Sequence, residues 1–159
     1  MIRIVTYVVL LVVFLIPGGV EWLLSQDKTT QMFVYHFFHG NIFHLFANGL
    51  ALYFLLPRVK PWQLILAYSI ATLSPLIATM PIVGISNIIY AIIGLRSPSF
   101  QSAWWRHYGT ITFLVVTLLM LFLSNISAVT HIVCFVSGVA ISVLVRWFKK
   151  IGRGSERYI

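Results

Sequence analysis

Charged residues are scarce in this sequence: they make up 9% of its 159 residues, and only three of them are Asp or Glu. Hydrophobic residues account for 60% of the chain. So few charges exclude an ordinary soluble domain, and this composition is typical of a protein that crosses a membrane several times. The length fits one compact bundle with short loops. We therefore predict a single membrane domain over residues 1–159, with a short basic tail from about residue 149.

Cysteine and the common metal-binding patterns are also nearly absent. The chain has one cysteine, Cys134, which excludes an internal disulfide. The metalloprotease pattern H-E-x-x-H does not occur. A metal site built from His36, His39, His44 and His131 stays open as an alternative. We expect no metal and no other cofactor.

A long stretch without any charge or histidine, Pro61–Leu95, indicates a broken membrane helix. One span needs about 20 residues and two need about 40, so the stretch must cross, turn and return with too little length for two full spans. Pro75, Pro81 and Gly84 mark where the break can fall. A helix that begins near Ser86 then starts inside the membrane. Because broken backbone at that depth must be buried or line a wet cavity, we expect a water-filled cavity between the first loop and this break.

Apolar stretches separated by polar or basic residues predict an all-α, polytopic membrane protein with six transmembrane helices. The expected spans are Ile4–Leu24, Asn41–Leu56, Trp62–Thr79, Ser86–Leu95, Tyr108–Leu123 and Ala128–Phe148. Residues 17–19, Pro-Gly-Gly, are expected to kink the outer end of the first span. The segment 31–40, rich in aromatics and histidine, is expected at the headgroup level. A cleaved signal peptide is the alternative for the first span, although no clear small-x-small cleavage site follows it.

The basic residues determine the expected orientation. All but one of the eleven Lys and Arg residues fall on one side of the six-span arrangement, and Lys28 falls on the other. Because cytoplasmic loops carry the excess of Lys and Arg, we expect both termini in the cytoplasm. The net charge of +8 does not indicate a nucleic-acid partner, since the charges are scattered at span ends instead of gathered on one face. The expected surroundings are a lipid bilayer, and the small size favours a bacterial inner membrane.

Three of the expected spans carry unusual polar residues near their outer ends. His44 and Asn48 are spaced i, i+4 and therefore share one face of the second span. Ser86 begins the fourth span, and His131 lies near the start of the sixth. Since these spans run in the same direction, we expect the four side chains at similar depth, a few residues below the outer surface. Polar groups inside a membrane are costly and usually functional.

A serine and a histidine at one depth are the minimum set for nucleophilic acyl transfer. A serine hydroxyl needs a nearby base to take its proton, and histidine suits that role near neutral pH. His44, Asn48 and the backbone N–H of Ser86 are candidate donors to a developing oxyanion. Tyr90, one turn after Ser86, is expected to pack against the ring of His131. No Asp or Glu lies near this depth, so the pattern predicts a dyad instead of a triad.

The order and spacing of these residues, and the spans that carry them, match a known pattern. Its members here are His39-x4-His44-x3-Asn48, Gly84-Ile85-Ser86 with Tyr90 and Gly94, and His131 with Gly138. The chain thereby resembles the rhomboid family of intramembrane serine proteases over nearly its whole length. The resemblance implies a six-helix core and a Ser86–His131 dyad, with His44 and Asn48 near the oxyanion. It also implies hydrolysis of peptide bonds in or near the transmembrane segments of substrate proteins.

The sequence departs from the family pattern at three places. Asn87 follows the serine where the family usually has glycine, and its side chain either crowds the oxyanion site or donates to it. The Trp-Arg pair often found in the first loop is replaced by Thr30–Gln31, so the usual loop anchor is missing. Cys134 replaces the first glycine of the GxxxG that typically follows the histidine. With Gly138 and Ser142 it still forms a stripe of small residues that is expected to pack against the fourth span.

Each single residue also has an ordinary structural explanation. A lone serine in a membrane helix usually bonds its own backbone, and a lone histidine is more often a packing residue. Two other functions therefore remain beside the protease and the metal site. One is a rhomboid-fold protein that binds transmembrane helices without cutting them, which Asn87 motivates. The other is a small transporter, which would usually show related halves with paired broken helices, whereas only one broken segment is present.

Overall fold

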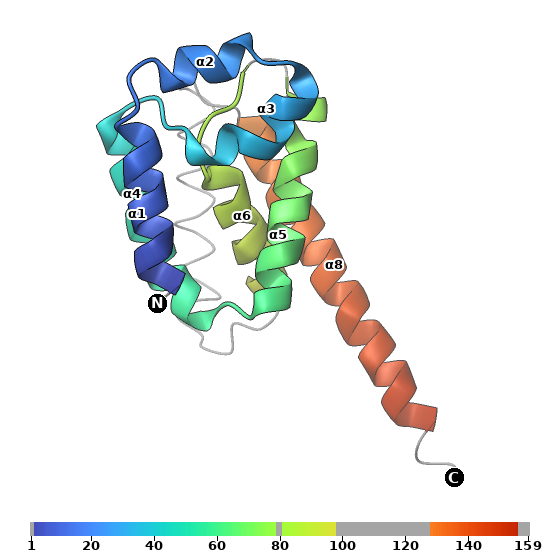
Figure 1. The fold of residues 1–159 in the computed structure, drawn as a ribbon. Helices are drawn as coiled ribbons and strands as arrows, with labels where there is room; N and C mark the ends of the chain where they lie inside the picture. The colour runs from blue at the N-terminus through green and yellow to red at the C-terminus, as the bar shows by residue number, and fades with distance from the viewer. Residues whose placement is uncertain (1, 79–80, 98–127, 156–159) are drawn as a thin grey trace.

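The computed structural model describes residues 2–78, 81–97 and 128–155 (Figure 1). Every regular element in these ranges is an α-helix or a 3-10 helix. The all-α fold predicted from the sequence is therefore confirmed for this part of the chain. The expected span Tyr108–Leu123 lies outside the described residues.

The first expected span is broken. Helix α1 covers Ile2–Phe14 and helix α2 covers Gly19–Ser25, with a bend of 84° between them (Figure 1). The prediction of one span over Ile4–Leu24 is thus wrong in its outer part, where the expected kink is a full break. Gly18 takes a left-handed conformation with φ of 69°, which favours glycine, and Pro17 cannot donate a backbone hydrogen bond. Together they turn the chain across the end of the bundle.

A short cap follows α2 and lies over the same end of the bundle (Figure 1). Helix α3 spans Lys28–Val34 and continues as the 3-10 helix η1, Tyr35–Phe37. Asp27 precedes α3, and its side chain accepts hydrogen bonds from two backbone N–H groups of the first turn at 2.9 and 3.0 Å. Most of the segment 31–40 is therefore helical. We call residues 27–37 the cap.

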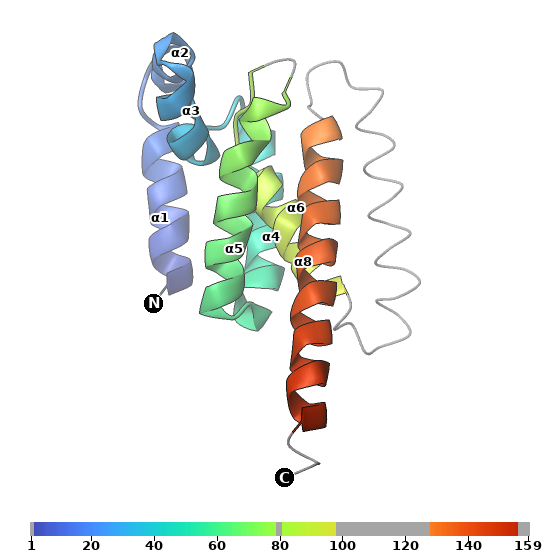
Figure 2. The same cartoon turned by 90° about the vertical axis from the view of Figure 1, so that its right-hand side faces the viewer.

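Helices α4 and α5 run in opposite directions below the cap (Figure 2). Helix α4 covers Ile42–Leu55, close to its predicted bounds, and is followed by the 3-10 helix η2, Leu56–Arg58. Helix α5 covers Pro61–Leu73 and passes into the 3-10 helix η3, Ser74–Leu76. It ends before the predicted Thr79, because the proline within η3 has no N–H to continue the α-helical ladder.

Helix α6, Ser86–Arg96, lies in the centre of the bundle (Figures 1 and 2). It begins at the predicted residue. All of its residues except Ile93 and Arg96 are buried, and it packs against α4, α5 and α8. Helix α8, Ala128–Ser155, is the longest described helix and continues past its predicted end at Phe148. Helices α4, α6 and α8 run in one direction, and α1 and α5 run in the other (Figures 1 and 2).

Two glycines let α6 and α8 approach to backbone contact. A Cβ atom on Gly94 would overlap a carbonyl group of α8, and one on Gly138 would lie 2.5 Å from the carbonyl oxygen of Ala91. Cys134 and Ser142, the other members of the expected small-residue stripe, are also buried. The stripe on α8 therefore faces α6, as predicted from the sequence.

One described helix is long and apolar enough to cross a membrane by itself, namely α8 over Ala128–Ile151. Helices α1 and α2 pass the same test as a bent pair, and α4 is a shorter apolar helix. Many large apolar side chains point outward from these helices, among them Phe43 and Phe46 on α4 and Phe148 on α8. Outward-facing apolar residues of this kind are what a lipid environment favours.

Replacing Gly138 by alanine should destabilise the protein, because the added methyl group would force α6 and α8 apart. We expect the thermal unfolding midpoint in detergent to fall by several degrees, because overpacking of this kind lowers the free energy of unfolding by about 1–3 kcal/mol. Gly49 in α4 offers a matched control, since a Cβ atom there would meet Tyr7 at an ordinary distance of 3.8 Å. A Gly138→Ala protein as stable as Gly49→Ala would contradict the close contact.

Candidate active site

A glycine turn brings the chain to the start of α6. Gly84 has a φ of 101°, a conformation that side-chain-bearing residues rarely adopt. A Cβ atom there would also lie 2.5 Å from the ring of His44 and 3.3 Å from Nδ2 of Asn48. Glycine is therefore required on two grounds, and the turn lies directly against the two polar residues of α4. Ser86 follows the turn as the first residue of α6.

Ser86 and His131 meet across α6 and α8. The distance from Ser86 Oγ to His131 Nε2 is 2.8 Å, and both residues are buried, with exposed fractions of 7% and 4%. The ring of Tyr90 stacks on the ring of His131 with centroids 4.5 Å apart and planes 11° from parallel. His131 Nδ1 is buried and has no hydrogen-bond partner within the described residues. The structure thus brings together the three residues that the sequence expected to meet.

Asn48 and His44 lie on the other side of the Gly84 turn. Asn48 is 6% exposed, and its Nδ2 atom has no hydrogen-bond partner in the part of the chain that the structure describes. A buried amide donor without a partner is unusual, because its lost hydration is not replaced. His44 is half-buried, and its ring centroid lies 5.1 Å from that of His39. The two side chains among the expected oxyanion donors are therefore close to the turn before Ser86.

Asn87 is fully buried and forms three side-chain hydrogen bonds. Its Nδ2 atom donates to the hydroxyls of Tyr35 at 3.1 Å and Ser74 at 2.7 Å. Its Oδ1 atom accepts a hydrogen bond from the hydroxyl of Thr130 at 3.2 Å. The amide is thus occupied by partners in η1, η3 and α8, and none of these is an expected oxyanion residue.

Sequence reasoning missed Tyr35, Ser74 and Thr130. Ser74 and Thr130 are polar residues in otherwise apolar stretches, and Thr130 adjoins the candidate histidine. Their polarity within apolar stretches is the feature of the sequence that could have identified these two residues. Tyr35 lies in the segment expected at the headgroup level, yet it is 1% exposed and its hydroxyl donates to the carbonyl of Ala71 in α5 at 2.8 Å. It helps to anchor the cap, whose Gln31 also bonds the carbonyl of Gln26 at 2.8 Å.

The four histidines that the structure describes do not gather into one metal-binding cluster. His36 is fully buried, with Nε2 at 3.4 Å from the hydroxyl of Thr72 in α5, while His39 lies beside His44. Within the described residues, no three His, Cys, Asp or Glu side chains come together in a way that would hold a metal ion. This part of the chain gives the alternative of a histidine metal site no support.

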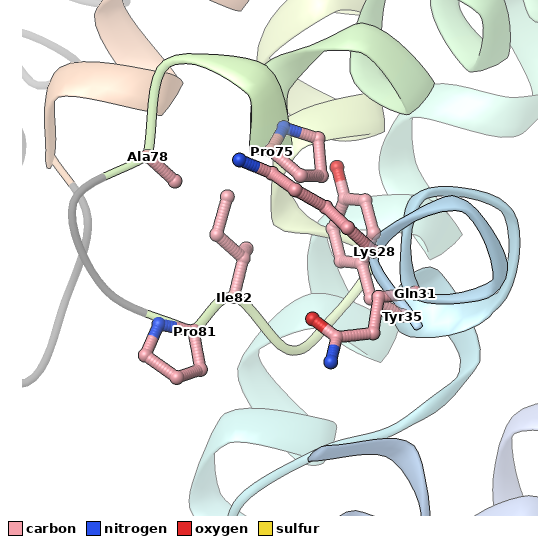
Figure 3. A pocket seen from close by; sticks show the side chains of 7 residues that line it. All are labelled: Lys28, Gln31, Tyr35, Pro75, Ala78, Pro81 and Ile82. Atoms are coloured by element: carbon pink, nitrogen blue, oxygen red, sulfur yellow. The ribbon is translucent and has the colours of Figure 1, made fainter. Parts of the chain in front are cut away.

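A cavity of about 300 Å³ opens between the cap and the chain that leads to Ser86 (Figure 3). It is lined by Lys28, Gln31, Tyr35, Pro75, Ala78, Pro81 and Ile82. The cavity lies in the region where the sequence predicts one. Its lining does not include Ser86 or His131, but Tyr35 belongs both to its wall and to the hydrogen-bonded group around Asn87.

The family model of the Rhomboid domain matches residues 26–148, which include the cap, both residues of the 2.8 Å contact and the glycines between α6 and α8. The chain belongs to the rhomboid family. A comparison with curated proteins gives no match. The resemblance drawn from the sequence is thereby confirmed.

Rhomboid proteins are embedded in the membrane and act on transmembrane substrates within the bilayer. The family consists generally of serine proteases and also includes inactive relatives. Membership therefore establishes a membrane protein with a helical rhomboid fold. Whether a member cuts its partners depends on the chemistry of its own site.

Two buried histidines near the cap make stability depend on pH. Burial lowers the pKa of His36 to about 3, and burial together with the nearby His44 lowers the pKa of His39 to about 4. A histidine in the unfolded chain has a pKa of about 6.5. Because the pKa values of both histidines are lower in the folded protein, the unfolded chain binds more protons than the folded one at a pH between the folded and the unfolded pKa values. Stability from these groups is therefore complete above about pH 6.5 and is lost as the pH falls towards the folded values.

We expect the unfolding midpoint of the wild type to fall as the pH is lowered from about 7 to about 4.5. His36→Gln removes one of the two titrating rings but keeps a polar group near Thr72. Its midpoint should fall less steeply over the same range. The measurement is thermal unfolding in detergent at a series of pH values. Parallel pH profiles for the wild type and the variant would contradict a neutral buried ring at His36.

Proposed function

We propose that this rhomboid protein hydrolyses peptide bonds in or near the transmembrane segments of other proteins, with Ser86 as nucleophile and His131 as base. The observation that carries the proposal is the 2.8 Å contact between Ser86 Oγ and His131 Nε2. That distance is within the range over which a serine hands its proton to a histidine. The two residues come from different helices, so only the folded bundle brings them together.

The reaction proceeds through an acyl-enzyme. Ser86 Oγ passes its proton to His131 Nε2 and attacks the carbonyl carbon of the peptide bond, which gives a tetrahedral intermediate. His131 returns this proton to the leaving amine as the C–N bond breaks. A water molecule, deprotonated by His131, then hydrolyses the ester and regenerates the serine. Nε2 must start without a proton, so Nδ1 carries the ring hydrogen, and the stacked ring of Tyr90 steadies the imidazole.

The oxyanion of the intermediate needs donors that are already in position. Asn48 Nδ2 is such a donor, since it is buried beside the Gly84 turn without a partner among the described residues. It gains its hydrogen bond when negative charge develops on the substrate carbonyl. His44 and the backbone N–H of Ser86, at the start of α6, complete the set, and the dipole of α6 favours negative charge there. Donors that are satisfied only in the transition state lower the barrier.

The proposed orientation has six spans, both termini in the cytoplasm and the site towards the outer face. The distribution of basic residues supports it. Lys60, Arg96 and Lys149 lie towards one end of the bundle, at the start of α5, at the end of α6 and in the lower part of α8 (Figure 1). Lys28 lies in the cap at the other end, next to the cavity of Figure 3. Water is proposed to enter from that side.

The competing function is an inactive rhomboid fold that binds transmembrane helices. Asn87 in place of the usual glycine is the feature that motivates it. The hydrogen bonds of its amide to Tyr35, Ser74 and Thr130 support the active alternative, because they leave the contact between Ser86 and His131 intact.

Ser86→Ala and His131→Ala should each lower cleavage of a transmembrane reporter in liposomes by at least about a thousandfold. A fluorophosphonate, which reacts with activated serines, should label the wild type and leave Ser86→Ala unlabelled. Ser69→Ala is the matched control, because this exposed hydroxyl in α5 bonds the carbonyl of Ile65 in its own helix at 3.0 Å and no other residue that the structure describes. It should cleave and be labelled like the wild type.

Each alternative has its own outcome in this experiment. Equal cleavage by the wild type and Ser86→Ala would remove Ser86 as the nucleophile. A wild type that neither cleaves nor takes the label would favour the inactive fold. Cleavage that a strong chelator abolishes would favour a histidine metal site.

Asn48→Ala should lower kcat by about 100- to 1,000-fold and leave KM nearly unchanged, because the donor is used in the transition state. Asn48→Asp keeps the shape of the side chain but replaces the donor by an acceptor, so it should be equally slow. Both are measured with the same reporter, and the unfolding midpoint of each variant checks that it is folded. An Asn48→Asp protein with wild-type kcat would exclude the proposed donor.

A further inference from the structure

Asn87 lies where four segments meet. It belongs to α6, and its amide bonds Tyr35 in η1, Ser74 in η3 and Thr130 in α8. Asn87 directly follows Ser86, and Thr130 directly precedes His131. The hydrogen bond between Asn87 and Thr130 therefore joins the same two helices as the contact between Ser86 and His131, one residue later on α6 and one residue earlier on α8.

One assignment of hydrogens gives every donor in this group an acceptor. The two hydrogens on Asn87 Nδ2 point to the oxygens of Tyr35 and Ser74. Both of these hydroxyls donate to the carbonyl oxygen of Ala71, at 2.8 and 2.7 Å, and Asn87 Oδ1 accepts from Thr130. An asparagine supplies two donors and an acceptor from one short planar group. The arrangement therefore uses both N–H donors of the amide and its acceptor oxygen.

Tyr35 connects the same group to the turn before the serine. Its carbonyl oxygen accepts a hydrogen bond from the N–H of Gly84 at 3.0 Å, while its hydroxyl is bonded to Asn87. Gly84 lies against His44 and Asn48. A single buried tyrosine thus links the cap, the turn beside the oxyanion donors and the start of α6.

We propose that Asn87 is a positioning residue that holds Ser86, His131 and the Gly84 turn in register with one another. The inference rests on the proposed protease function and adds to it a residue that touches neither the substrate nor the reacting atoms. All four side chains of the group have exposed fractions of 3% or less, so water does not compete for their hydrogen bonds. Small displacements of reacting groups are costly, and a shift of about 1 Å can lower a rate about a hundredfold.

Although the family usually has glycine after the serine, glycine should be the poorer residue at position 87 of this protein. Restoring the usual glycine by Asn87→Gly should slow this enzyme, because Tyr35 and Ser74 each lose a donor and Thr130 loses an acceptor. We expect kcat for the transmembrane reporter to fall at least about tenfold while KM changes less than about twofold. The rate of fluorophosphonate labelling should fall in parallel, since labelling needs the activated serine but no helix binding. Ser69→Ala again serves as the control.

Thr130 gives a second test that does not depend on how Asn87→Gly folds. Thr130→Val has the same shape but no hydroxyl, and it should lower kcat and the labelling rate. Thr130→Ser keeps the hydroxyl and should restore both. In the double variant of Thr130→Val with Asn87→Ala, the loss in kcat should be smaller than the product of the two single losses, because both changes remove the same bond.

The outcomes separate this inference from the protease assignment. Wild-type cleavage that is lost in Ser86→Ala but unchanged in Asn87→Gly would overturn the positioning role alone. Equal kcat values for Thr130→Val and Thr130→Ser, or a loss confined to the unfolding midpoint or to KM, would also overturn it. A wild type that neither cleaves nor is labelled would overturn the protease assignment and the positioning role with it.

Discussion

The backbone contact between α6 and α8 at Gly94 and Gly138 is the constraint on which the site depends. Gly94 lies about two turns after Ser86 on α6, and Gly138 lies about two turns after His131 on α8, so each pair shares one helix face. The two helices run in the same direction (Figure 2). Where their backbones touch, towards the end of α6, the side chains about two turns earlier are brought to hydrogen-bonding distance. The catalytic geometry proposed for this protein is thus set by two residues that carry no side chain.

Several of the buried polar side chains that the structure describes lie around the start of α6. Those around Asn87 are paired with one another, whereas Nδ2 of Asn48 is left without a partner in the described residues. The hydrogen bonds around Asn87 offset the free-energy cost of burying its polar groups. The buried Nδ2 of Asn48 keeps that cost until negative charge develops on the substrate carbonyl beside it. Rigid support and an unsatisfied donor therefore lie on opposite sides of the Gly84 turn.

The sequence allowed much of this site to be predicted, because its key residues lie near the first turns of helices. The uncharged stretch from Pro61 to Leu95 indicated a helix starting at Ser86, and the i, i+4 spacing put His44 and Asn48 on one face. Helix ends were less predictable. The break after α1 depends on the conformation of Gly18, and the early end of α5 depends on the proline in η3.

The partners of Asn87 could not be predicted, for a different reason. They come from η1, η3 and α8, and which hydroxyl reaches the amide depends on how the cap settles on α5 and α6. No periodicity in the sequence encodes that placement. The two expectations for Asn87, crowding the oxyanion site or donating to it, both followed from its position next to Ser86. The structure instead shows bonds to residues far away in the chain.

Helix α6 is enclosed by protein on nearly all sides, with α4, α5 and α8 packed against it and only Ile93 and Arg96 partly exposed. Its side chains therefore contact other parts of the protein and hardly contact the surrounding lipid, detergent or water. Exchanging lipid for detergent, or one acyl-chain length for another, alters what the outward faces of α1, α4 and α8 touch. The dielectric surroundings of Ser86 and Asn87 would stay nearly constant through that exchange, so differences in behaviour between bilayer and micelle would trace to the outer helices.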